Sequence, residues 1–186
     1  MEGVRRPAKI VDLLRLLAFQ IGQEISIAEI AASLALDRQT VERYMDLLEK
    51  VFVVFRVGGF SRNLRKEITK NPRYYFFDNG VRNSLIQNFN PLGLRNDVGQ
   101  LWENYLLIER RKANQIAGRA VNAYFWRTYD RKEIDSIEEY DGKIHGYEFK
   151  WQSGDIRRAT RKEFLETYPE SSLSTIRQDN FESFLE

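Results

Sequence analysis

The segment Val121–Trp151, VNAYFWRTYDRKEIDSIEEYDGKIHGYEFKW, decides the fold of this 186-residue chain. It is rich in aromatic and β-branched residues, and turn-forming residues interrupt it. This pattern predicts three successive β-strands, at 121–127, 133–140 and 143–151. Asp141-Gly142 separates the last two strands and is a strong hairpin signal, because both central positions of a type I′ turn need positive φ.

A two-residue turn fixes which residues face each other across this hairpin. It places Tyr140 opposite Lys143 and Asp135 opposite Glu148, and Lys150 projects from the same face as Glu148. Two directly opposed carboxylates destabilise a sheet unless something neutralises them, as a divalent cation would. The alternative is a simple ion-pair ladder in which Glu133 faces Lys150.

The acidic residues and the lysine also resemble a known family. Asp135 followed by Glu148-Phe149-Lys150 is similar to the D…(D/E)-x-K core of restriction-endonuclease-like nucleases. The resemblance implies a metal-dependent deoxyribonuclease in which Asp135 and Glu148 hold Mg²⁺ or Mn²⁺ and Lys150 assists the attacking water. It also makes Glu103, on the predicted helix 100–114, a further catalytic carboxylate and metal ligand.

The wider chain resembles the region C-terminal to the ATPase of many prokaryotic AAA-type ATP-binding proteins, domain of unknown function 4143. The motifs that carry the resemblance are FFDNGVRNSL, LWENYLLIE, EIDSI and YEFKW, and it extends from about Pro7 to the C-terminus. It implies an α/β (α+β) protein with a winged helix at 1–80, a connector at 81–98 and a restriction-endonuclease-like domain at 99–186. It also implies an AAA-type ATPase partner, which precedes this region in the family. The chain itself has no G-x-x-x-x-G-K-[ST] motif and hence no ATP site of that kind.

The N-terminal third has the pattern of three helices and a β-hairpin. Ser26 and Asp37 are predicted N-caps of the second and third helices, and Gly58-Gly59 is a predicted turn. Basic and amide side chains on the third helix and after the first strand are candidate DNA contacts, and so are two arginines at the start of the helix predicted at 156–168. These candidates are Arg38, Gln39, Arg43, Arg62, Arg65, Lys66, Arg157 and Arg158. Acidic residues on the third helix would weaken its attraction to DNA, so a protein-docking role for this module is the alternative.

Composition limits the remaining classes of function. The net charge is +2, which does not by itself require nucleic acid, and there is no cysteine for a disulfide or thiolate metal site. The single histidine, His145, cannot support a multi-histidine zinc site. Without a signal peptide or a long apolar run, we expect no membrane association and a cytoplasmic location.

Two functions therefore remain at this stage. The first is a metal-dependent nuclease attached to an ATPase. The second is a non-catalytic DNA- or protein-binding module that targets or regulates that ATPase.

Overall fold

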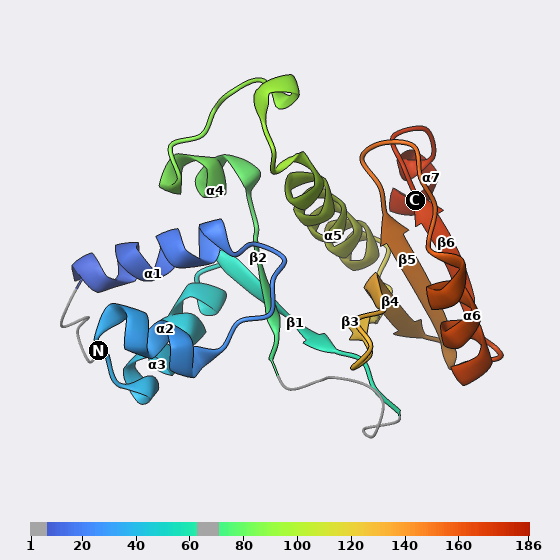
Figure 1. Cartoon of the computed structure of the whole chain (residues 1–186), viewed down its shortest axis with the longest axis horizontal. Coiled ribbons are helices and arrows are strands. Elements are labelled where there is room, and N and C mark those ends of the chain that lie inside the picture. Colours follow the sequence, from blue (N-terminus) through green and yellow to red (C-terminus); the bar gives the residue numbers. More distant parts are fainter. Residues whose placement is uncertain (1–6, 63–70) are drawn as a thin grey trace. The chain divides into compact units, whose positions relative to one another are not determined.

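The computed structural model describes residues 7–62 and 71–186 and has the predicted mixed α+β fold (Figure 1). The chain divides into two compact units. The first comprises Met1–Arg56 and Pro72–Leu94, and the second comprises Val57–Asn71 and Arg95–Glu186. The predicted connector 81–98 is thus shared, because its first part belongs to the first unit and its end to the second.

The first unit is built mainly of helices. Its elements are α1 (Pro7–Phe19), α2 (Ile27–Leu34), α3 (Arg38–Lys50), the first half of β1 (Val54–Gly59), β2 (Arg73–Phe76), α4 (Asn79–Leu85) and η1 (Leu92–Leu94). The predicted N-caps are confirmed: the Ser26 side chain accepts from the Glu29 N–H, and Asp37 accepts from the Thr40 N–H. Such caps satisfy backbone donors that have no partner within the helix. Leu13, Leu17 and Val41 are fully buried or nearly so between these elements.

The second unit is a sheet with helices on both faces. Its elements are α5 (Val98–Ile116), β3 (Asn122–Arg127), β4 (Glu133–Tyr140), β5 (Lys143–Phe149), α6 (Arg158–Thr167), β6 (Ser172–Ile176) and α7 (Phe181–Leu185). The strand order is β2-β1-β3-β4-β5-β6. β3, β4 and β5 are antiparallel neighbours, whereas β1 pairs with β3, and β6 with β5, in parallel.

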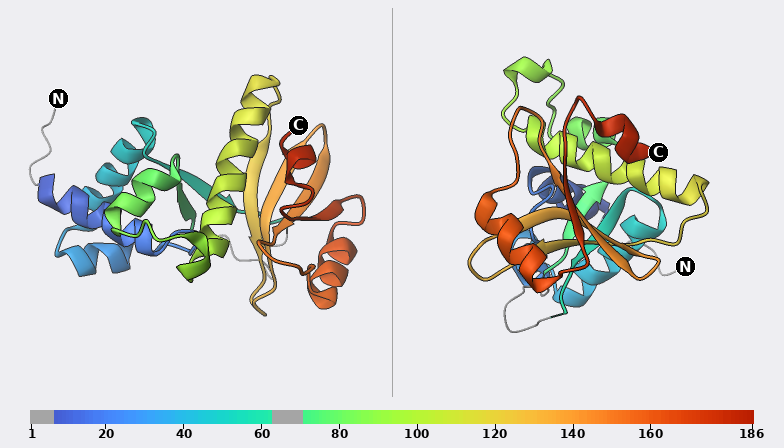
Figure 2. Two further views of the ribbon diagram at one scale, coloured as in Figure 1. Left: turned by 90° about the horizontal axis from the view of Figure 1, so that it is seen from above. Right: turned by 90° about the vertical axis from the view of Figure 1, so that its right-hand side faces the viewer.

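Helices α5 and α6 cover opposite faces of this sheet (Figure 2). On the α5 side, Arg110 reaches Glu138 of β4. On the α6 side, Phe164 packs edge-on against Trp126 of β3, with ring centroids 5.3 Å apart. Gly146 of β5 allows this approach, because a Cβ there would lie 3.4 Å from Phe164 and 2.7 Å from Leu173. Odd- and even-numbered residues of β5 therefore face different helices.

The central prediction of three strands is confirmed, with the last strand ending at Phe149 rather than at Trp151. One detail of the predicted helix 100–114 is wrong. The charged run 109–112 has the sequence pattern of a solvated helix face, but Arg110 is buried against β4. None of the helices in the described ranges is long and apolar enough to cross a bilayer.

Candidate active site

The hairpin of β4 and β5 positions the candidate site. Asp141 and Gly142 have φ of 50° and 71°, the positive values that a type I′ turn requires. The resulting register pairs Tyr140 with Lys143 and continues to Ser136 with Tyr147. The paired register ends there, and Asp135 and Glu148 are the next residues on the two strands.

Asp135, Glu148 and Lys150 make direct contacts at this end of the hairpin. Asp135 Oδ2 accepts a 2.8 Å hydrogen bond from the backbone N–H of Phe149, which places its carboxylate at the peptide bond after Glu148. Lys150 Nζ donates to Glu148 Oε1 at 2.6 Å. Glu133, which the ion-pair ladder would place opposite Lys150, forms an ion pair with Arg127 at 3.1 Å. Lys150 forms its ion pair with the candidate ligand Glu148.

Glu148 has one carboxylate oxygen that the contacts do not account for. Its side chain is 13% exposed, and within the described residues its buried Oε2 has no hydrogen-bond partner. A buried acceptor without a donor costs free energy, so its presence requires an explanation such as a bound ion. Lys150 is 36% exposed and can still be reached from solvent.

Glu103 does not join these residues in a three-carboxylate group. Across residues 7–62 and 71–186 there is no group of three or more histidine, aspartate or glutamate side chains placed to hold a metal ion. Glu103 lies on α5, the helix that covers the sheet face of Glu138. Asp135 and Glu148 alternate with the residues of that face and project to the α6 side.

The loop after Lys150 is fixed by Asp155, a residue to which sequence reasoning assigned no role. Asp155 accepts from the Thr175 hydroxyl, from the Ile156 N–H at 2.8 Å and from Arg161 at 3.4 Å. The Thr175 hydrogen bond, followed by that of Ile156 and the charges of Arg161 and Arg177, lowers the pKa of Asp155 below its usual value. No local sequence pattern predicts these partners, because Thr175 and Arg177 lie on and after β6.

The candidate DNA-contacting residues differ in how they are paired. Arg38 forms an ion pair with Glu42 at 3.0 Å, and Arg62 forms one with Glu139 at 2.5 Å. Arg43 donates to Thr40 Oγ1 at 3.1 Å, and Gln39 is exposed. The candidates Arg65 and Lys66 lie outside the described residues.

Arg157 and Arg158 differ from the other basic candidates. Both are exposed, and within the described residues neither guanidinium group has a hydrogen-bond or ion-pair partner. Arg158 begins α6, and Arg157 directly precedes it. α6 covers the sheet face that carries Asp135 and Glu148, and the loop from Lys150 leads directly into it. The two arginines are therefore at the same end of the sheet as the acidic pair.

Comparison with known proteins places the chain among domains of unknown function. Residues 98–181 match the model of a domain of unknown function, DUF4143, which confirms the predicted resemblance for this part. Residues 1–92 match a different domain of unknown function, DUF8612, so the DUF4143 match does not extend over nearly the whole chain. No solved structure matches the chain.

Three curated relatives are longer bacterial proteins named only as uncharacterised. The proteins from Mycobacterium tuberculosis and Mycobacterium bovis are each 32% identical over 151 residues, which cover 80% of this chain and 33% of the relative. A protein from Haemophilus influenzae is 26% identical over 89 residues, covering 45% of this chain and 22% of the relative. The chain thus spans about a third of the length of the mycobacterial relatives.

Proposed function

We propose that the second unit is a metal-dependent phosphodiesterase domain acting on DNA. The observation that carries the proposal is the unpartnered, buried Oε2 of Glu148, beside Lys150 and at the same end of the hairpin as Asp135. Mg²⁺ prefers carboxylate oxygens and is commonly held by one or two carboxylates together with substrate phosphates and water. The pair of Asp135 and Glu148 is sufficient for such a site, and Glu103 is not needed.

Each side chain has a separate role in this proposal. Glu148 offers Oε2 to the cation, while its Oε1 holds the ammonium group of Lys150. The backbone N–H of Phe149 fixes the orientation of the Asp135 carboxylate. Lys150 directs its positive charge toward a phosphate oxygen. A bound Mg²⁺ or Mn²⁺ would activate water and stabilise charge on the phosphate.

Arg157 and Arg158 are the preferred phosphate contacts in this arrangement. Their guanidinium groups carry no internal ion pair among the described residues, so binding DNA breaks none. Arg38 and Arg62 must leave Glu42 and Glu139 before they contact phosphate. The first unit, which we interpret as a winged helix, therefore contributes less to affinity than the start of α6.

Calorimetric titration of Mn²⁺ separates the metal site from the nuclease activity. We expect wild-type protein to bind the ion and Asp135→Asn/Glu148→Gln to bind none, with Glu166→Gln as an exposed carboxylate control. Wild-type protein should also cleave plasmid or single-stranded DNA with Mn²⁺, and Lys150→Ala should bind the ion but cleave at least about tenfold more slowly. Equal metal uptake by wild type and the double variant would contradict the proposal.

The second candidate is a non-catalytic module that targets an attached AAA-type ATPase to DNA. It is favoured by the missing third carboxylate in the described residues and by the greater length of the relatives. This function requires no metal. Arg157→Ala/Arg158→Ala should then weaken DNA binding and reduce its salt dependence by about two phosphate contacts, whereas Asp135→Asn should leave affinity unchanged.

A further inference from the structure

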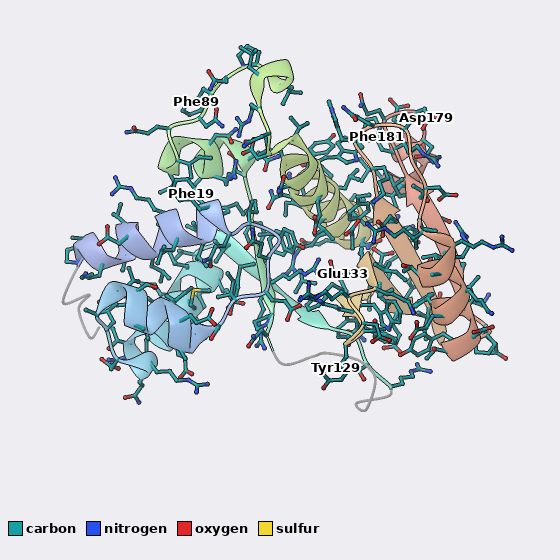
Figure 3. The ribbon with its side chains drawn as sticks, in the orientation of Figure 1. Phe19, Phe89, Tyr129, Glu133, Asp179 and Phe181 are labelled. Carbon is teal, nitrogen blue, oxygen red and sulfur yellow. The ribbon has the colours of Figure 1, made fainter. Side chains whose placement is uncertain are left out.

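A hollow of about 780 Å³ lies at the carboxyl end of two neighbouring parallel strands. Its walls come from the loop that follows β5, including Trp151, Gln152 and Asp155, and from the segment that follows β6, including Arg177 and Asp179. Figure 3 shows Asp179 near Phe181 at this end of the sheet. In open α/β sheets, ligands bind outside the carboxyl ends of the strands, so the hollow has the position of a binding site.

Hydrogen bonds join the two walls of the hollow. Gln178 donates its side-chain amide to the Trp151 carbonyl at 2.5 Å, and Arg177 Nε donates to the Gly154 carbonyl at 2.7 Å. Asp155 also ties the first wall to β6 by accepting from the Thr175 hydroxyl. A site whose walls are already fixed loses little conformational entropy when a ligand enters.

One wall of the hollow is aromatic. The Trp151 ring is half-buried and packs edge-on against Trp102 of α5, with centroids 5.5 Å apart and planes at 69°. Trp102 in turn contacts Tyr105 and Phe181. These neighbours hold the indole of Trp151 in place. A fixed indole beside an open hollow is suited to stacking on a planar ring.

The charges of the lining favour a neutral ligand group over an anionic one. Asp155 lies within ion-pair distance of Arg161 and Arg177, which leaves Asp179 as the remaining carboxylate of the lining, so the hollow offers no surplus of positive charge for a phosphate. The exposed side chains of Gln152 and Ser153 supply hydrogen-bond donors and acceptors. An aromatic wall with amide, hydroxyl and carboxylate groups matches a nucleobase.

The hollow also adjoins the proposed phosphodiester site. A Cβ at Gly154 would lie 3.8 Å from Lys150 Cδ, so the loop that lines the hollow packs on the lysine side chain. A nucleotide with its phosphate at Lys150 could place its base against Trp151.

We propose that this hollow binds one unpaired nucleobase next to the phosphate held at Lys150, and that the substrate is therefore single-stranded or frayed DNA. This inference rests on the proposed function for the position of the phosphate. A base inside a duplex is paired and stacked, and bringing it out costs a few kcal/mol. An already unpaired base avoids that cost, and duplex DNA should bind more weakly to this site.

The test measures binding without metal, so that it does not depend on hydrolysis. Fluorescein-labelled hexathymidylate and a blunt twelve-base-pair duplex are titrated with the full chain in EDTA, and anisotropy reports the affinity. We expect wild type to prefer hexathymidylate and Trp151→Ala to bind it at least about fivefold more weakly, the lower range for loss of one stacked base. Trp151→Phe should restore most of the affinity, and Tyr129→Ala, an exposed aromatic control, should match wild type.

Each outcome bears on one proposal. Unchanged hexathymidylate affinity in Trp151→Ala, or an equal loss in Tyr129→Ala, would overturn the base site. Thermal unfolding of each variant shows whether a loss reflects damage to the fold, and the Phe variant decides the question if the Ala variant is unstable. A single-strand preference that depends on Trp151, in a protein that neither binds Mn²⁺ nor cleaves DNA, supports the base site and overturns the phosphodiesterase alone.

Discussion

Arg110 of α5 and Glu138 of β4 form a buried ion pair, with Nη2 and Oε2 2.8 Å apart. Asn114 also donates to Glu138 Oε1 at 3.0 Å, and Arg110 donates to the Phe184 carbonyl at 2.5 Å. These contacts join α5, the sheet and α7 on the face opposite the candidate site. Burial, together with the charge of Glu138, raises the pKa of the neighbouring Tyr147 to about 12.

Removing one partner of this ion pair should destabilise the second unit strongly. Glu138→Ala leaves Arg110 buried without a counter-charge, and we expect a loss of about 3–5 kcal/mol in urea unfolding. Replacing both partners, as in Arg110→Met/Glu138→Leu, should recover most of that loss, because no buried charge remains. A single variant as stable as wild type would contradict the view that the pair is buried in solution.

The β4–β5 turn should be sensitive at Gly142. Its φ of 71° lies in the left-handed region, and alanine there costs about 1–2 kcal/mol. Gly99→Ala, in open space near the start of α5, is the matched control and should not lower the thermal midpoint. If Gly142→Ala melts with wild type, the turn is not of type I′ in solution.

Most local parts of this fold are predictable from the sequence because short-range rules determine them. The predicted turn at Gly58-Gly59 is wrong, since both glycines belong to β1. The Ser26 and Asp37 caps, the three central strands and the register through Asp141-Gly142 all follow from neighbouring residues. The Asp135 carboxylate accepts from the backbone N–H of Phe149, and Lys150 contacts Glu148, so the three residues lie at the same end of the hairpin.

Long-range contacts could not be predicted in this way. Arg110 lies in the charged run 109–112 and has the pattern of a solvated residue, yet packing of α5 on β4 buries it. Asp155 meets Thr175 only because β6 lies beside β5. Whether Glu103 can join the candidate site depends on which face of the sheet α5 covers. The periodicity of the α5 sequence does not reveal that face.

Asp155→Asn should loosen the loop after Lys150 at neutral pH. Because the folded-state pKa of Asp155 is lowered below 3.8, the charged form stabilises the fold above that pH, and the contribution is lost as pH falls. The thermal midpoints of wild type and Asp155→Asn should therefore differ at pH 7 and converge below about pH 4. Asp179→Asn, an exposed neighbour, should follow wild type throughout. A difference that persists unchanged in acid would exclude a role for the charge.

His145 provides a direct measure of burial on the α5 face. Burial lowers its pKa below 6.5, with smaller contributions from Lys143 and Arg110 and an opposing one from Glu138. Its neutral ring stacks on Tyr140, with centroids 4.6 Å apart, and its Nδ1 contacts the Ser172 hydroxyl at 2.8 Å.

The chain has a single histidine, so one proton NMR titration reports His145 without ambiguity. We expect a midpoint below 6.5. Since the neutral form is favoured by folding, stability is complete above that pH and declines as pH falls toward the folded-state pKa. The thermal midpoint of wild type should fall between pH 7 and pH 5 more than that of His145→Gln. A titration midpoint at or above 6.5 would contradict the burial of the His145 ring on this face of the sheet.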